Sequence, residues 1–270
     1  AFPHHPYGRE AEGSLDSVPR IGTADLRDYV HRVFARNELT ISIVGDIDAK
    51  TAGELIDRAF GGLPARNDLK PVASATPQGL GRRIVINLDV PQAVVTFGGL
   101  GLARHDPDFM AGYVANHILG GGTFSSRLYR EVREKRGLAY GVSENLVWLR
   151  HAAVVLGTTA TRADRTADAL ALVERETKRM AEAGPTADEL AAAKSFLKGS
   201  YALSLDSSSK IAAQLTQIQL DKLGIDYIAR RGAMIDAITL EDAKRAAKRL
   251  YGGGMLVTVA GRPKGLASSE

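Results

Sequence analysis

The apolar residues of this 270-residue chain recur with two spacings, one typical of helices and one typical of strands. Spacings of three and four residues predict helices at 23–34, 49–60, 107–118, 125–136, 163–183, 187–203 and 207–222, with shorter helices up to residue 250. Runs rich in β-branched residues predict strands at 39–47, 82–88, 91–99, 140–149, 152–160 and 255–261. Strands come in pairs, helices follow in runs, and one strand closes the pattern. This order predicts an α+β fold, with a mixed or antiparallel sheet covered by helices.

Several predicted helices begin at residues that favour helix starts. These are the N-cap candidates Thr23 and Asp48, the Asp106-Pro107 pair, and the capping box of Thr186 and Glu189. The serines of "LDSSSK" are better explained as an N-cap before Ile211 than as a nucleophile, because the chain has no G-x-S-x-G motif.

Two segments of the chain resemble one another. Residues 23–45 and 239–261 each read as a threonine-capped helix, a turn and a hydrophobic strand that ends in glycine, and threonine and glycine are 22 positions apart in both. The pattern predicts a duplicated module. Residues 1–64 are too few to bury a complete core and are expected to be the end of a first domain. Residues 65–81 are predicted to be a linker, and residues 82–264 a second domain.

Composition narrows the class of protein. Hydrophobic residues make up 44% and charged residues 24%, which is typical of a soluble globular protein. The absence of cysteine excludes disulfides, thiolate nucleophiles and zinc–thiolate sites. The net charge of +4 is spread among acidic residues, so no nucleic-acid partner is expected. No apolar run approaches the roughly 20 residues of a membrane span, and no signal peptide is visible, which leaves cytoplasm and periplasm open.

Metal ligation is not expected in this chain. None of its six histidines pairs with another at H-x-x-x-H or H-x-x-E-H spacing. His117 lies on the apolar face of a predicted helix and is expected to be a core or interface residue.

The three glycines Gly120, Gly121 and Gly122 do not form a phosphate loop, because they follow a helix and no lysine is placed to reach a phosphate. Two interpretations remain. The glycines either end the preceding helix and form a turn, or they keep the backbone bare so that a ligand chain can pass close by.

A cationic helix follows these glycines, and its cations are Arg127, Arg130, Arg133, Lys135 and Arg136. Leu128 and Val132 are expected to face inward, which places Arg133 at the border of buried and exposed surface. The helix should end at Gly137 and bring Arg133 beside Tyr140, where both could donate to a carbonyl oxygen that develops negative charge. The alternative is a solvated face on which the cations pair with Glu131 and Glu134.

The stretch "HILGGGTFSSRLYREVREKRGLAYGV" closely resembles the second domain of the pitrilysin/insulinase family of zinc metallopeptidases, which includes the mitochondrial processing peptidases. The segments "HPYGR", "DVPQAVVTFGG", "ELAAAKSFLKGSYAL" and "VTVAGRP" agree with it. The resemblance covers nearly the whole chain and implies a duplicated metallopeptidase-like domain.

The resemblance implies that Arg133 and Tyr140 bind the substrate carbonyl and that an extended peptide pairs with a sheet edge beside the glycines. The inverted H-x-x-E-H zinc motif of the family is absent. Zinc is therefore expected in a homologous domain or subunit, with which this chain would form a homo- or heterodimer, and this chain is expected to be inactive by itself. The alternative is a catalytically inert scaffold or assembly subunit of the same family.

Overall fold

The computed structural model describes residues 1–268, which form two compact units. The first contains residues 1–4 and 74–198 and the chain from residue 231 onward, and the second contains residues 5–73 and 199–230. The helices α5 (Ala187–Leu203) and α7 (Tyr227–Asp236) contribute residues to both units. The predicted domain boundaries near residues 64 and 82 stay a prediction.

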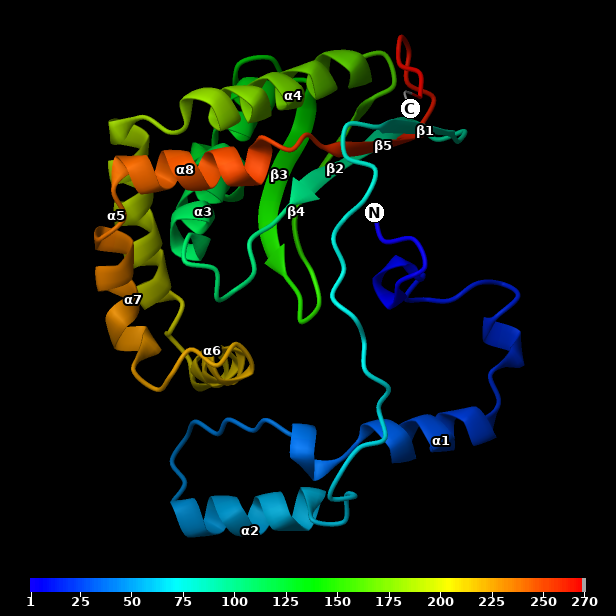
Figure 1. Ribbon diagram of the computed structural model, residues 1–270, viewed down its shortest axis with the longest axis vertical. Coiled ribbons are helices and arrows are strands. Elements are labelled where there is room, and N and C mark those ends of the chain that lie inside the picture. Colours follow the sequence, from blue (N-terminus) through cyan, green and yellow to red (C-terminus); the bar gives the residue numbers. More distant parts are fainter. Residues whose placement is uncertain (269–270) are drawn as a thin grey trace. The chain divides into compact units, whose positions relative to one another are not determined.

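A five-stranded mixed sheet organises the first unit (Figure 1). Its strands are β1 (Arg83–Asn87), β2 (Gln92–Leu100), β3 (Ala139–Trp148), β4 (Ala153–Arg162) and β5 (Leu256–Gly261), in the order β1-β5-β2-β4-β3. β1 and β5 run parallel, and the other neighbouring strands are antiparallel. The predicted α+β fold with a mixed sheet is therefore confirmed.

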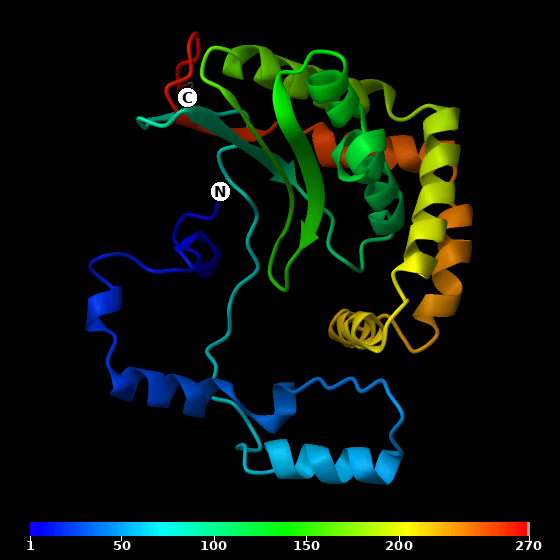
Figure 2. The same ribbon diagram turned by 180° about the vertical axis from the view of Figure 1, so that it is seen from behind.

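Three helices cover one face of this sheet, as Figures 1 and 2 show. α3 (Phe109–Asn116) contacts β3, α8 (Leu240–Tyr251) contacts β2, and α4 (Thr166–Ala183) contacts β2 and β4. Alternate strand residues such as Val95, Phe97, Val257 and Val259 are buried beneath these helices. The intervening residues are more exposed, as Val94 and Leu156 are, so the sheet has one core face and one open face.

The second of the two similar segments forms the predicted helix and strand, because α8 is followed by β5 between β1 and β2. The strand predicted at 39–47 is wrong, since this segment forms no ladder. A strand needs a neighbour to satisfy its backbone groups, and no described strand pairs with it. Gln219 of α6 (Ser208–Leu220) instead donates to the Ile41 carbonyl and to the Ser42 hydroxyl, at 3.3 and 2.8 Å.

The helices of the second unit expose much of the apolar face that the sequence predicted to be buried. In α1 (Thr23–Val33), Leu26 and Tyr29 are more than half exposed, and Leu55 of α2 (Ala49–Phe60) is almost half exposed. The prediction of these helices is confirmed, whereas the burial of their apolar faces is not seen in the described residues.

Helix starts follow the predicted caps in most cases. The Asp48 carboxylate accepts a hydrogen bond from the Thr51 N–H at 2.9 Å, Ser207 caps α6, and the Thr186–Glu189 capping box forms. Thr23 is wrong as an N-cap, because Gly22 holds that position and donates its N–H to the Asp25 carboxylate at 2.8 Å.

α3 begins at Phe109, two residues after the predicted Pro107. Asp106 accepts the Asp108 N–H at 2.9 Å and so forms a turn before the helix. Arg245 and Arg249 of α8 hold both carboxylates, with closest nitrogen–oxygen distances of 2.7 Å. Their hydrogen bonds lower the pKa of Asp106 and of Asp108 despite partial burial.

Candidate functional site

The cationic segment is helical from Arg127 and widens into a π-helix over Tyr129–Glu134. Leu128 and Val132 are fully buried as predicted, and Arg133 is half-buried beside them. Gly137, with φ of 56°, turns the chain by donating its N–H to the Arg133 carbonyl at 2.9 Å. The predicted helix over 125–136 is thus shorter and more widely wound than expected, but its buried face and its glycine stop are confirmed.

A β-bulge at the start of β3 sets the direction of Tyr140. Ala139 pairs with Thr161 and Val142 pairs with Thr159, so two residues of β3 lie opposite one residue of β4. The Thr159 hydroxyl donates to the Gly141 carbonyl at 2.8 Å and stabilises the bulge. As a result Tyr140 is 86% exposed, although the alternation of the buried residues Val142, Glu144 and Leu146 would place it on the buried face.

Arg133 and Tyr140 lie side by side. The guanidinium carbon of Arg133 is 4.6 Å from the centroid of the Tyr140 ring and 5.0 Å from that of Tyr129, so two aromatic rings hold it. Sequence analysis missed Tyr129, although its position four residues before Arg133 on a helix was a usable signal.

The other cations of this segment are ion-paired. Glu189 accepts Arg127 at 2.6 Å and Arg130 at 3.7 Å, and Glu131 pairs with Lys135 and Arg136. The alternative interpretation, a solvated face paired with Glu131 and Glu134, therefore holds only in part. These four cations are paired with carboxylates, but Glu189 takes the place of Glu134 and Arg127 is buried. Within residues 1–268, Arg133 makes no such ion pair, and the Tyr140 hydroxyl makes no hydrogen bond.

The three glycines form a turn packed against β3. Gly120 and Gly121 end a π-helix over His117–Gly121, and Gly122 follows as its C-cap. A Cβ on Gly120 would lie 2.5 Å from the Cβ of Glu144 and 3.0 Å from its backbone nitrogen. The close approach of the turn to β3 therefore requires glycine at position 120, whether or not a ligand also passes close by.

Gly120→Ala should lower the free energy of unfolding by about 1–3 kcal/mol, because the Glu144 Cβ cannot rotate away from the added methyl group. Urea denaturation followed by circular dichroism measures the change. Gly141→Ala is the matched control, since a Cβ there meets no atom within 4 Å. Equal effects of the two substitutions would show that the packing of the turn on β3 is not tight.

These residues surround a groove of about 900 Å³ on the open side of β3 and β4. Its lining includes Gly120, Gly121, Tyr129, Arg133 and Tyr140, together with the other residues of 137–143 and the β4 residues from Thr158 to Arg162. Gly122 is buried and is not part of the lining. The structure thus brings together four of the five predicted site residues.

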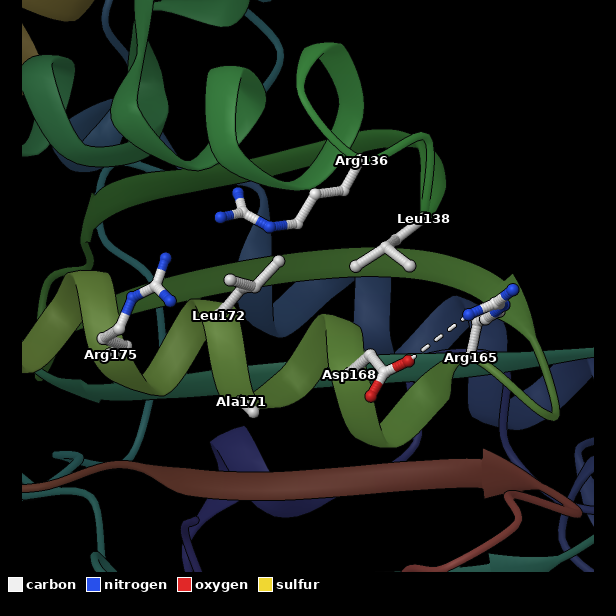
Figure 3. A pocket seen from close by; sticks show the side chains of 7 residues that line it. All are labelled: Arg136, Leu138, Arg165, Asp168, Ala171, Leu172 and Arg175. Atoms are coloured by element: carbon white, nitrogen blue, oxygen red, sulfur yellow. Dashed lines mark ion pairs between the residues drawn. The ribbon is translucent and has the colours of Figure 1, made fainter.

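A second hollow, of about 550 Å³, lies next to Leu138 and is rich in arginine (Figure 3). Its arginines already have carboxylate partners. Arg165 pairs with Asp168 at 3.6 Å, and Glu131 accepts Arg136 at 2.6 Å and Arg175 at 3.4 Å. Because these arginines are already paired, the hollow is a weak candidate for an anion site. The groove, which contains the unpaired Arg133, is the stronger candidate for a ligand site.

No group of three or more His, Asp or Glu side chains that could hold a metal ion occurs among residues 1–268. His117 is buried and stacks on Phe196, with ring centroids 5.0 Å apart, and burial lowers its pKa. The described residues therefore do not fit a zinc ion, which the family resemblance places in a homologous domain or subunit. Within the same residues, no helix combines the length and the apolar character needed to span a membrane.

Comparison with known proteins identifies the family. The model of the peptidase M16 inactive domain matches residues 20–197, and the chain belongs to this family. It is 30% identical over its whole length to an uncharacterized zinc protease of Streptomyces coelicolor, covering 60% of that protein. It is 25% identical to the beta subunit of the mitochondrial-processing peptidase of Blastocladiella emersonii, over 97% of this chain and 57% of that one.

Solved structures agree with this assignment. A peptidase M16 inactive domain from Pseudomonas fluorescens superposes with a TM-score of 0.87 at 30% identity, over 97% of this chain and 62% of that chain. A chain of complex III2 from Candida albicans has the same fold, with a TM-score of 0.74 at 17% identity over 97% of this chain and 64% of that one. This chain spans about 60% of the length of the first curated relatives. The predicted resemblance to zinc metallopeptidases is confirmed.

Proposed function

We propose that this chain is the substrate-holding half of a zinc metallopeptidase. Its groove binds an extended peptide, and Arg133 and Tyr140 contact the carbonyl oxygen of the bond to be cleaved. The zinc ion belongs to a homologous domain or subunit, which is the partner of this chain. The relatives named as a zinc protease and as a processing peptidase support the reaction class.

One observation carries the proposal. Among the five cations of the segment 127–136, Arg133 alone has no carboxylate partner within the described residues, and it lies against a tyrosine whose hydroxyl is also free there. A guanidinium and a phenol are hydrogen-bond donors that stabilise negative charge on a carbonyl oxygen. An unpaired cation that is already oriented in a groove is suited to an incoming acceptor.

The groove also suits a main chain. β3 is an outer strand among the described strands, and the groove follows its first residues and the bare backbone of Gly120 and Gly121. Extended peptides are commonly held along sheet edges through their backbone groups, with side chains accommodated alternately. We therefore infer an unfolded or extended polypeptide as the substrate.

Tyr140→Phe should lower the kcat of the assembled peptidase about 10²-fold, because it removes one donor to the carbonyl oxygen and keeps the ring that stacks on Arg133. The assay combines this chain with a homologous zinc-bearing half that carries H-x-x-E-H. Cleavage of a quenched fluorescent peptide gives the rate.

Arg133→Gln should produce a loss of similar size. Arg130→Gln is its control, since Arg130 lies one turn away, pairs with Glu189 and does not line the groove. An unchanged rate in Tyr140→Phe would remove the carbonyl-binding role. A stable complex that cleaves no peptide would favour the inert scaffold, a role consistent with the relative from Helicobacter pylori named a non-peptidase homolog.

A further inference from the structure

Beneath the glycine turn lies a carboxyl group that the proposed function does not use. Glu144 is in β3, four residues after Tyr140, and is 1% exposed. Its Oε1 accepts a hydrogen bond from the Asn116 amide at 2.9 Å and another from the Tyr251 hydroxyl at 2.8 Å. Its Oε2 is buried and has no hydrogen-bond partner within the described residues.

These contacts join β3, α3 and α8 next to the groove. Asn116 ends α3 and immediately precedes the π-helical turn, and its side-chain amide oxygen Oδ1 accepts a hydrogen bond from the Leu146 N–H of β3 at 3.1 Å. Tyr251 is the last residue of α8. Because Gly120 packs directly on Glu144, the position of this side chain fixes one wall of the groove.

Among residues 1–268, no positively charged side chain pairs with Glu144. α3 contributes the neutral Asn116, the turn contributes Gly120, and Gly157 of β4 lies opposite in the sheet. Tyr251 is the titratable group in contact, and burial raises its pKa, so it stays neutral. Burial also raises the pKa of Glu144 to about 7, although the two hydrogen bonds act in the other direction.

We propose that Glu144 is a positioning residue of the groove. Together with Asn116 and Tyr251, the protonated Glu144 side chain holds the glycine turn against β3. The link to substrate binding rests on the proposed function, whereas the link to the turn does not. Ionisation of Glu144 places a negative charge in the core, on a carboxylate whose own Oε2 has no hydrogen-bond partner among the described residues. This charge favours opening of the turn. Substrate binding in the groove then weakens as the pH rises from 6 to 8.5.

Hydrogen exchange measured by mass spectrometry on the full chain tests this proposal. After correction for intrinsic exchange, protection of the amides in 117–123 should fall about tenfold between pH 6.0 and pH 8.5, because below about pH 7 the closed state keeps the Glu144 proton that the open state has already released. Glu144→Gln keeps a neutral side chain of the same shape and should remove this pH dependence. Tyr251→Phe removes one hydrogen bond to Glu144 and should lower protection of the turn at both pH values.

Glu176→Gln is the matched control, because Glu176 is an equally buried glutamate of α4 that pairs with Arg175 and Arg179 instead. It should retain the wild-type pH dependence of the turn. If the turn amides at pH 6.0 are no less protected than those of β2 and β5, they exchange only when the whole chain unfolds. Glu144 would then be a general stability residue, and the positioning role would be overturned. Unchanged protection of the turn in the wild type would overturn it as well. Neither readout involves peptide, so a groove that binds no peptide would contradict the proposed function alone.

Discussion

Replacing Arg127 with alanine should lower the free energy of unfolding by about 3–5 kcal/mol, the range measured when one partner of a buried ion pair is removed. The Arg127 side chain is only 4% exposed and contacts Glu189 through two nitrogens, at 2.6 and 2.7 Å. It also donates to the carbonyl of Gly184, the C-cap of α4, at 3.0 Å. One guanidinium therefore connects the cationic segment with the end of α4 and the start of α5.

The charge on Glu189 explains the size of the effect. Burial would raise the pKa of Glu189, but hydrogen bonds from Arg127 and Thr186 outweigh burial and lower it to about 2. Removal of Arg127 leaves the Glu189 carboxylate partly buried without its closest hydrogen-bonded cation. Urea denaturation at pH 7 measures the loss.

Arg130→Ala is the control for this prediction. Arg130 pairs with the same glutamate at 3.7 Å, but its side chain is 47% exposed, so the loss should stay below about 1 kcal/mol. Similar losses for Arg127→Ala and Arg130→Ala would contradict the assignment of Arg127 as a buried link.

The free energy of unfolding should fall by roughly 2–3 kcal/mol between pH 5 and pH 8 through Glu144 alone. Its pKa is about 7 in the folded chain and near 4.5 when exposed. Between these values the folded state holds a proton that the unfolded state has released, so stability decreases as the pH rises and levels off above pH 7. A shift of one pKa unit corresponds to about 1.4 kcal/mol.

Urea denaturation of the wild type and of Glu144→Gln at pH 5 and pH 8 isolates this contribution. All other titrating groups are shared, so the difference between the two proteins should change by the stated amount, with Glu144→Gln relatively more stable at pH 8. A difference that is the same at both pH values would show that Glu144 is ionised throughout or is accessible to water.

Much of the fold could be predicted from the sequence because its signals are local. The capping box of Thr186 and Glu189 and the buried pair Leu128 and Val132 depend only on residues a few positions apart. The strand predicted at 39–47 is wrong because strand formation depends on a neighbouring strand, which β-branched composition cannot supply.

In the candidate site, too, local features could be predicted from the sequence and contacts between distant residues could not. Sequence spacing placed Arg133 near Tyr140, and the structure confirms that they are adjacent. The sequence could not show that Arg127 and Arg130 meet Glu189, which comes from a helix about 60 residues further along the chain. The bulge that exposes Tyr140 and the π-helical turns each insert one residue into a regular pattern, and periodicity does not predict such insertions.

The contact of Arg133 with two tyrosine rings has a consequence for its affinity for a ligand. An unrestrained arginine loses up to about 2 kcal/mol of rotamer entropy when a ligand immobilises it. Here Tyr129 and Tyr140 already restrict the long side chain before any acceptor arrives. Much of that entropic penalty falls on the folding of the chain and not on complex formation. Under the proposed function, less entropy therefore opposes binding of the substrate carbonyl to Arg133.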